Sequence, residues 1–444
     1  MKKFLYIAAI MATVATATTS CNNEVEDLFD KSAAERTQEA VDEYSSVLTA
    51  NGGKWVLEYF TNPDEPGYIY IFTFDNNGSV KISGKNLWIG NAFKSETSAW
   101  EVISDNGPVL TLNTYNTIFH LFANPENVVV PGASSDDIDE TGYGHYGDYE
   151  FMLMEAKDGV VRLKGKKWGV THYLRQLDAN TDDEAYLHKI DEVKASLFSS
   201  KFPELVITDG NTGERFFMTG ATSSIVTIHP ENILALDQHT TANFITTENG
   251  IRFMSEVEVE REDKTKDPLT FQTFTIAENG SLVCAEDPNI VITAHNYGFL
   301  LASQDYSWSF TGENCTGAIA DAYQTLADDF KTVFKNKRNL KSVEFSSALV
   351  SGERLGTIKL VLQSSSATYY CKREQKSDSS FEISLLGTGD KNGEAFKTQI
   401  ASIEPFLNTL VGEYNLTSEE VLAPKVIKAT RADNESSTFT VTVK

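Results

Sequence analysis

The sequence predicts a mainly β (α+β) protein built from antiparallel meander units, barrels or sandwiches, each preceded by a helix. Many short runs of aromatic and β-branched residues alternate with turn residues, which is typical of up-and-down β structure. Three segments with helical spacing begin near residues 32, 181 and 318, and so start 181 − 32 = 149 and 318 − 181 = 137 residues apart. We therefore expect a helix and a meander to recur three times along the 444 residues.

The first unit opens with a helix. Ser32 and Glu35 have the spacing of a capping box, in which each side chain satisfies a main-chain amide near the other. Apolar residues then recur at helical spacing over 41–48, and Asn-Gly-Gly at 51–53 ends the helix. The strands expected after it cover residues 54–60, 68–74, 79–83, 98–104, 109–113, 117–122, 148–156, 160–164 and 169–175.

The second and third units repeat this order. Thr181 and Glu184 form another capping box before a helix that extends to Leu197, and a third helix is expected over 318–335. Strand patterns follow at 204–208, 214–219, 225–229, 251–259, 269–277, 281–284, 341–347, 357–363, 368–372, 381–386 and 438–443, with helical spacing at 403–410. The resulting division is a signal peptide at 1–20, a helix plus barrel-like meander at 21–178, a second helix plus β unit at 179–312, and an α+β unit at 313–444.

The first twenty-one residues have the pattern of a bacterial lipoprotein signal. Lys2 and Lys3 precede the apolar and small-residue run 4–17, which is too short for a permanent membrane helix. Thr-Thr-Ser then stands directly before Cys21, the arrangement cut in lipoproteins. We expect cleavage before Cys21, acylation of its thiol, and attachment to the membrane through that lipid.

The charge restricts the partners. The formal net charge is −25, and loss of Lys2 and Lys3 with the signal takes it to −25 − 2 = −27. Nucleic acids are excluded as partners because their binding needs phosphate neutralisation by Lys and Arg. Neutral ligands such as glycans are compatible with this charge, and divalent cations are favoured by it.

The opening of the mature chain resembles a Bacteroidota lipoprotein family of unknown function. The resemblance rests on the runs at 51–55 (Asn-Gly-Gly-Lys-Trp), 70–75, 107–116, 147–151 and 163–167, and thins after residue 178 apart from 250–253. The acidic residues Glu24, Glu26 and Asp27 behind Cys21 resemble the signal that sends such lipoproteins to the outer face of the outer membrane. The family is found beside outer-membrane transporter pairs of the starch-utilisation type, so the resemblance implies an accessory role in nutrient import. It implies no catalytic residue.

A second likeness is to lipocalin-type barrels. Gly-Lys-Trp at 53–55 matches their G-x-W, and Arg175 on the last strand of the first unit is expected over Trp55 as a cation–π pair. Trp100, Trp168 and Trp308 fall on strand patterns and are expected in the core. Both a ligand-holding barrel and a filled barrel or sandwich agree with this sequence, and the filled form is favoured.

An acidic loop partly matches a calcium site. Asp137, Asp139 and Thr141 alternate before Gly142, and Asp148 closes a twelve-residue span. Calcium takes oxygen ligands at such alternate positions, with a glycine at the sharp bend. The match is partial, since a Thr stands at position five, the shorter Asp at position twelve, and a strand follows. Calcium is therefore one hypothesis and a solvated acidic loop the other.

Aromatic residues in irregular segments are candidates for ligand binding. Trp88 and Phe93 lie in the stretch 84–97, and Tyr143, His145 and Tyr146 lie in the acidic loop. Flat rings on loops suit the faces of sugars. The alternative is that these rings cover the end of the barrel, where they would bury large areas.

No enzyme motif occurs in the sequence. His-Glu-x-x-His, Gly-x-Ser-x-Gly and the P-loop are absent, and the seven histidines lack metal-ligand spacing. Once Cys21 is acylated, Cys284, Cys315 and Cys371 allow at most one disulfide. We predict a non-enzymatic, glycan- or nutrient-binding accessory of an outer-membrane importer. The alternatives are a glycan or peptide hydrolase with an unrecognised carboxylate pair, and a structural subunit that binds only the transporter.

Overall fold

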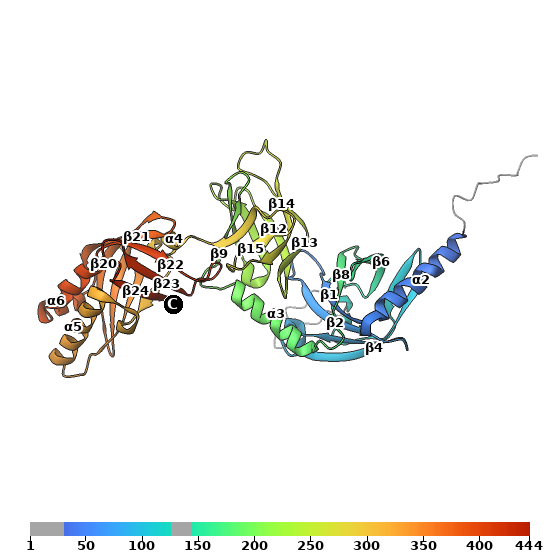
Figure 1. Ribbon diagram of the computed structural model, residues 1–444, viewed down its shortest axis with the longest axis horizontal. Helices are drawn as coiled ribbons and strands as arrows, with labels where there is room; N and C mark the ends of the chain where they lie inside the picture. The colour runs from blue at the N-terminus through green and yellow to red at the C-terminus, as the bar shows by residue number, and fades with distance from the viewer. Residues whose placement is uncertain (1–30, 126–143) are drawn as a thin grey trace, which may run out of the picture.

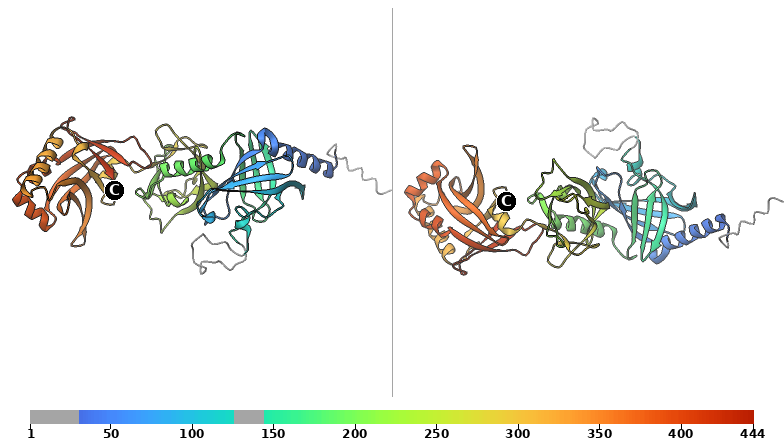
Figure 2. Two further views of the ribbon diagram at one scale, coloured as in Figure 1. Left: turned by 90° about the horizontal axis from the view of Figure 1, so that it is seen from below. Right: turned by 90° about the horizontal axis from the view of Figure 1, so that it is seen from above.

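Three closed antiparallel β-barrels follow one another along the part of the chain that the structure describes. The computed structural model describes residues 31–125 and 144–444. Within these ranges each barrel has eight strands, and the barrels lie in a row with α2 at one end and the C-terminal barrel at the other (Figure 1). Two further views show the same row (Figure 2). The predicted mainly β class is confirmed.

The first barrel closes by pairing of β1 with β8, in which Val56 lies opposite Arg175. Asp158 and Gly159 both have positive φ in the β6–β7 hairpin, as the Asp-Gly signal there requires. Residues 117–122, predicted as a strand, instead form coil and the start of η3. The elements are α2 (Ala33–Thr49), η1 (Ala50–Gly52), β1 (Lys54–Tyr59), β2 (Tyr68–Phe74), β3 (Ser79–Gly84), η2 (Leu87–Ile89), β4 (Lys94–Ser104), β5 (Pro108–Leu112), η3 (His120–Ala123), β6 (Glu150–Lys157), β7 (Val160–Gly165) and β8 (Thr171–Gln176).

Helix α2 begins and ends as its sequence requires. The Ser32 hydroxyl accepts from the Glu35 amide, and the Glu35 carboxylate accepts from the Ser32 amide, so the capping box is formed. After the helix the chain turns at Gly53, whose φ is +66°. A Cβ at Gly53 would lie 2.0 Å from the carbonyl oxygen of Phe74, so only glycine allows this close approach.

The second barrel follows α3. The N-cap of α3 is Asp182, whose side chain accepts from the amide of Ala185. The capping box predicted from Thr181 to Glu184 is therefore not formed, because the N-cap lies one residue later and its third helical residue is an alanine. Strands β12 and β16 were not recognised in the sequence. The elements are α3 (Asp183–Leu197), β9 (Glu204–Asp209), β10 (Arg215–Thr219), η5 (Ala221–Ser223), β11 (Ile225–Pro230), β12 (Thr240–Thr247), β13 (Gly250–Val259), β14 (Leu269–Ile276), β15 (Leu282–Cys284) and β16 (Ile290–Ala294).

The third barrel differs from the expected order. Its long helix α5 follows the first strand β17, and the short helix α4 precedes that strand. The predicted boundary at 312 therefore falls inside the barrel, between β17 and α5. The elements are α4 (Tyr297–Ala302), β17 (Trp308–Phe310), η6 (Gly312–Asn314), α5 (Gly317–Val333), β18 (Leu340–Val350), β19 (Glu353–Leu362), β20 (Ser366–Ser377), β21 (Ser380–Thr388), α6 (Lys391–Gln399), α7 (Ile403–Thr409), β22 (Gly412–Thr417), β23 (Val426–Arg431) and β24 (Thr438–Val443).

The barrels are filled with side chains. Trp55, Tyr59, Tyr70 and Phe151 are fully buried within the core of the first barrel, and corresponding apolar clusters occupy the other two. Inward-facing residues of small barrels fill the interior in this way. Arg175 does not lie over Trp55 as predicted: it forms an ion pair with Glu58, and its guanidinium lies 5.7 Å from the ring of Tyr173.

At the junction of the second and third barrels, each barrel contributes an apolar side chain to the core of the other. Leu422, from the β22–β23 loop, packs in the core of the second barrel. Phe202, which precedes β9, packs in the core of the third barrel against Tyr306 and Trp308. Burial of one such side chain contributes about 1.5–3 kcal/mol, so each exchange stabilises the junction.

The first and second barrels meet through polar contacts. Buried Asp183 at the start of α3 pairs with Lys54 and Lys81 of the first barrel. The Asn243 side-chain amide on β12 donates to the carbonyl oxygens of Asn62 and Glu65, at 2.9 and 2.5 Å. These contacts fix the 62–67 loop of the first barrel against the second.

None of the helices within 31–125 and 144–444 is long and apolar enough to cross a membrane.

The three cysteines within the described residues are free thiols. Cys284 and Cys371 are buried, and Cys315 is half-buried. Burial raises the pKa of each, to about 11, 11 and 12 respectively.

Candidate functional site

The structure brings two of the predicted ligand-binding residues together at one end of the first barrel. Trp88 on η2 and His145 before β6 have ring centroids 3.9 Å apart. The indole of Trp88 donates to the hydroxyl of Tyr68 at 2.7 Å, and that hydroxyl donates to Glu65 at 2.9 Å. Glu65 also lies 3.0 Å from Nδ1 of His145. The two rings are inclined by 47°, and the network links Trp88 and His145 to Glu65 in the loop between β1 and β2.

The other predicted aromatic residues do not join this network. Phe93 is half-buried between η2 and β4, and Tyr143 lies outside the described residues. Tyr146 packs edge-to-face against Trp168, with centroids 4.8 Å apart. Trp168 was predicted in a core strand, but it is half-buried in the turn between β7 and β8, with the Lys167 ammonium 4.7 Å from its ring.

Asp148 is the one predicted calcium ligand that the structure describes. Its carboxylate accepts hydrogen bonds from the amides of Lys167 and Trp168, at 2.7 and 3.2 Å, and so stabilises the turn after β7. Burial raises the pKa of Asp148, and these two hydrogen bonds oppose that shift. The other proposed ligands, Asp137, Asp139 and Thr141, lie outside the described residues, and calcium binding stays a prediction. No cluster of three or more His, Cys, Asp or Glu suited to a metal occurs within 31–125 and 144–444.

An aromatic surface that was not predicted from the sequence lies where β5 ends and β6 begins. Tyr115 and Tyr149 are 58% and 41% exposed. Buried His120 lies between them, with ring centroids 5.3 Å from Tyr115 and 4.9 Å from Tyr149 and inclinations of 35° and 36°. We call Tyr115, His120 and Tyr149 the aromatic shelf.

Strand pairing builds the aromatic shelf. Strands β5 and β6 are antiparallel, with Thr111 opposite Glu150. The residues that follow β5 therefore lie beside those that precede β6, which brings Tyr115 close to Tyr149. Both tyrosines stand among polar residues in turns. This pattern is the feature of the sequence that could have indicated exposed rings at these positions.

The shelf is held in place from below. The buried side chain of Asn116 donates to Ser98 Oγ at 3.1 Å and accepts from the amides of Ile118 and Phe119. The amide of Asn116 donates to Nδ1 of His120 at 2.9 Å. Burial lowers the pKa of His120, so its ring is neutral at pH 7. The shelf thus presents two exposed tyrosine rings that are held against a buried, uncharged imidazole.

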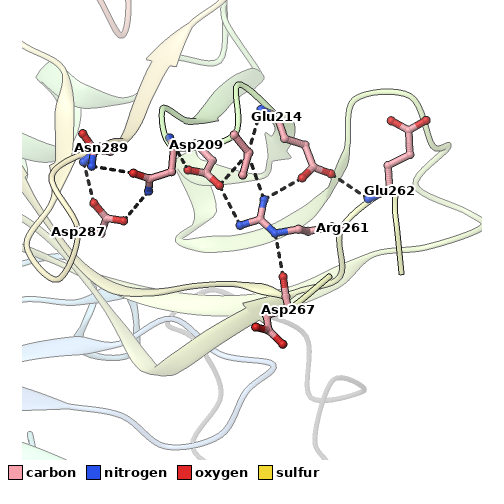
Figure 3. Close-up of polar contacts among 9 residues, drawn as sticks. Asp209, Glu214, Arg261, Glu262, Asp267, Asp287 and Asn289 are labelled. Atoms are coloured by element: carbon pink, nitrogen blue, oxygen red, sulfur yellow. Dashed lines mark hydrogen bonds and ion pairs between the residues drawn. The ribbon is translucent and has the colours of Figure 1, made fainter. Parts of the chain in front are cut away.

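The carboxylate cluster around Arg261 on the second barrel bears on the hydrolase alternative. Arg261 lies between Asp209 and Glu214, with 2.8 Å from Nη2 to Asp209 and from Nη1 to Glu214, and its Nε donates to the carbonyl of Asp267 (Figure 3). Burial alone would raise the pKa of Asp209, but hydrogen bonds from Asn211, Thr212 and Arg261 outweigh it and lower that pKa. A glycosidase acid needs a raised pKa. The cluster therefore acts as an ion-paired anchor for the 260–268 loop.

One family model matches more than half of the chain. A family model described as "Domain of unknown function (DUF4302)" matches residues 25–273, which span the first barrel and most of the second. No curated protein matches the chain.

Three solved structures were also compared. An uncharacterized protein from Bacteroides eggerthii is 21% identical, covers 28% of this chain and 97% of its own, and has a TM-score of 0.17. The beta subunit of DNA polymerase from Streptococcus pyogenes is 9% identical over 91% of this chain and 98% of its own, with a TM-score of 0.13. A Transferrin Binding Protein B mutant from Haemophilus parasuis is 10% identical over 86% and 65%, with a TM-score of 0.13.

Proposed function

For a chain that belongs to the family described as a domain of unknown function (DUF4302), we propose a role as a lipid-anchored, non-enzymatic ligand-binding accessory of an outer-membrane import system. The ligand is a neutral glycan, and it binds on the aromatic shelf. The anchor is the lipid on Cys21, and the protein faces the cell exterior. The transporter association rests on the family resemblance described above, and the ligand class rests on the shelf.

The aromatic shelf is the observation that carries this proposal. Exposed tyrosine rings present flat apolar faces with a hydroxyl at one edge, which suits the alternating C–H and O–H groups of a sugar. The neutral state of His120 and the formal charge of −25 favour an uncharged ligand over an anion. A preformed surface also avoids part of the ordering cost of binding.

A glycan array with the chain from Asn22 onward tests the proposal. The double variant Tyr115→Ala/Tyr149→Ala should no longer bind the glycans that the unaltered chain binds on the array. Leu236→Ala is the matched control, because Leu236 is 95% exposed on the second barrel, away from the shelf. Binding that survives in the double variant, or that is lost equally in the control, contradicts the proposal.

A structural role is the second candidate function. Leu234 and Leu236, 71% and 95% exposed, lie in the loop between β11 and β12. Exposed apolar side chains on one loop favour contact with a protein partner. In a pull-down with the transporter pair, Leu234→Ser/Leu236→Ser should release the transporter if this loop is the contact. Retention of the transporter by that variant would remove this candidate.

A further inference from the structure

A cavity of about 390 Å³ opens between the first and second barrels, apart from the aromatic shelf. Its lining comes from β1, β8, α3, β13 and β14, and it includes Glu58, Arg175, Tyr186 and Arg252. Small-molecule sites typically measure about 300–1,000 Å³ and combine apolar walls with a few polar groups. Val56, Ile69 and Phe274 line the same cavity and supply apolar surface.

One buried carboxylate holds two arginines at this cavity. Glu58 is 1% exposed, and its Oε1 lies 2.7 Å from Nε of Arg175, on the same barrel. Its Oε2 lies 2.8 Å from Nε of Arg252, on the second barrel. Both guanidinium groups lie near the ring of Tyr173, at 5.7 and 5.4 Å. One carboxylate thus pairs with two guanidinium groups, through the Nε of each.

Several hydrogen-bond donors at the cavity are not used within the protein. Arg252 donates from Nη1 to Thr273, but among the described residues its Nη2 has no hydrogen-bond acceptor. Within the same ranges neither terminal nitrogen of Arg175, nor the hydroxyl of Tyr186, has one. Burial and the charges of Glu248 and Glu58 raise the pKa of Tyr186, so its hydroxyl keeps its proton.

We infer that this cavity binds a small molecule bearing a single carboxylate. The planar fork of an arginine pairs with a carboxylate through two parallel hydrogen bonds, and the Tyr186 hydroxyl is a third donor. Asp158 and Glu248 also line the cavity and bring the formal charge of its lining to 2 − 3 = −1, so polyanions are disfavoured. Because the arginines belong to different barrels, the bound ligand would also join the two barrels.

Titration calorimetry with the full chain tests this inference at fixed pH and ionic strength. The probes are glucuronate, its neutral counterpart glucose, and inorganic phosphate. Glucuronate should bind and glucose should not, and phosphate should bind more weakly than glucuronate. Binding of glucose as tight as that of glucuronate overturns the inference, as does a preference for phosphate.

Both test variants are conservative, so we expect the fold to be kept. Arg175→Lys leaves Glu58 a cationic partner but removes the planar fork, and Tyr186→Phe removes a hydroxyl without a partner among the described residues. Each should weaken glucuronate binding about tenfold, the effect of one charge-assisted hydrogen bond. The control is Arg162→Lys, an exposed arginine of the first barrel that pairs with Glu155 and does not line the cavity. If both Arg175→Lys and Tyr186→Phe bind glucuronate like the unaltered chain, the inference is wrong. Tyr115→Ala/Tyr149→Ala should leave this binding unchanged, which separates the cavity from the aromatic shelf.

Discussion

The indole nitrogen of Trp55 donates a hydrogen bond to the carbonyl oxygen of Leu48, 2.8 Å away. Leu48 lies in the last turn of α2, and Trp55 lies on β1, so the bond attaches the helix to the first strand. The third barrel repeats this contact: Trp308 on β17 donates to the carbonyl of Leu300 on α4 at 3.1 Å. Both carbonyls are among those a helix end leaves without a helical partner.

Replacing Trp55 by Phe should destabilise the first barrel by about 1–3 kcal/mol, because the buried carbonyl of Leu48 loses its donor. Native-state hydrogen exchange read by mass spectrometry checks this, since it reports the stability of each barrel separately. Peptides of β1 and β8 should exchange faster, and peptides of the third barrel should not. Trp308→Phe should give the reverse pattern. Equal effects on both barrels in either variant would contradict the assignment.

His172 should make the first barrel less stable in mild acid. It is fully buried, accepts a hydrogen bond from the Phe60 amide, and burial lowers its pKa from 6.5 to about 3. In the unfolded chain the imidazole of His172 therefore binds a proton near pH 6.5, whereas in the folded chain it binds one only near pH 3. Stability is full above pH 6.5 and falls by about 1.4 kcal/mol per pH unit below it.

The measurement is the free energy of unfolding of the first barrel between pH 7 and pH 4.5, followed by hydrogen exchange. The range stops above the usual pKa of carboxylates, about 4, so that their titration contributes little. In His172→Gln the free energy of unfolding should fall less steeply as the pH is lowered, because the unfolded chain binds one proton fewer. An unchanged slope in this variant would show that another group titrates.

Glu58→Gln should loosen the junction between the first two barrels. The variant leaves Arg252 and Arg175 without their anion, and breaking a buried ion pair from one side costs about 3–5 kcal/mol. Because Arg175 is one-third exposed, water screens part of this loss, and the lower value applies. Limited proteolysis should then cut the connection near residues 177–182 sooner than in the unaltered chain. Glu155→Gln, which breaks the exposed pair with Arg162, is the control and should not change the cleavage rate.

Cys21→Ala should abolish acyl labelling and release the protein from the membrane fraction, because the lipid is the proposed anchor. Metabolic labelling with a fatty acid analogue and fractionation of the cells measure both effects. Protease treatment of intact cells tests the orientation, since a protein on the outer face should be degraded before lysis. A variant that stays acylated and membrane-bound would disprove the site.

The sequence by itself determined the local features of this protein. The Ser32–Glu35 capping box, the Asp158–Gly159 turn and strands such as Tyr68–Phe74 and Thr438–Val443 depend on neighbouring residues, and the structure has them where they were predicted. The short strand β16 was missed because its five residues carry too little periodicity to stand out.

Only the tertiary structure decided which distant residues meet. Tyr115 and Tyr149 form one surface because β5 pairs with β6, and Glu58 meets Arg252 because the second barrel packs against the first. Arg175 pairs with Glu58 and not with Trp55 for two reasons. The indole of Trp55 donates to Leu48 of α2, and the buried carboxylate of Glu58 lies beside the guanidinium of Arg175. Such contacts depend on strand pairing and barrel packing over long separations in the chain. Local sequence patterns specify each strand and helix, whereas the relative placement of these elements is a property of the folded core.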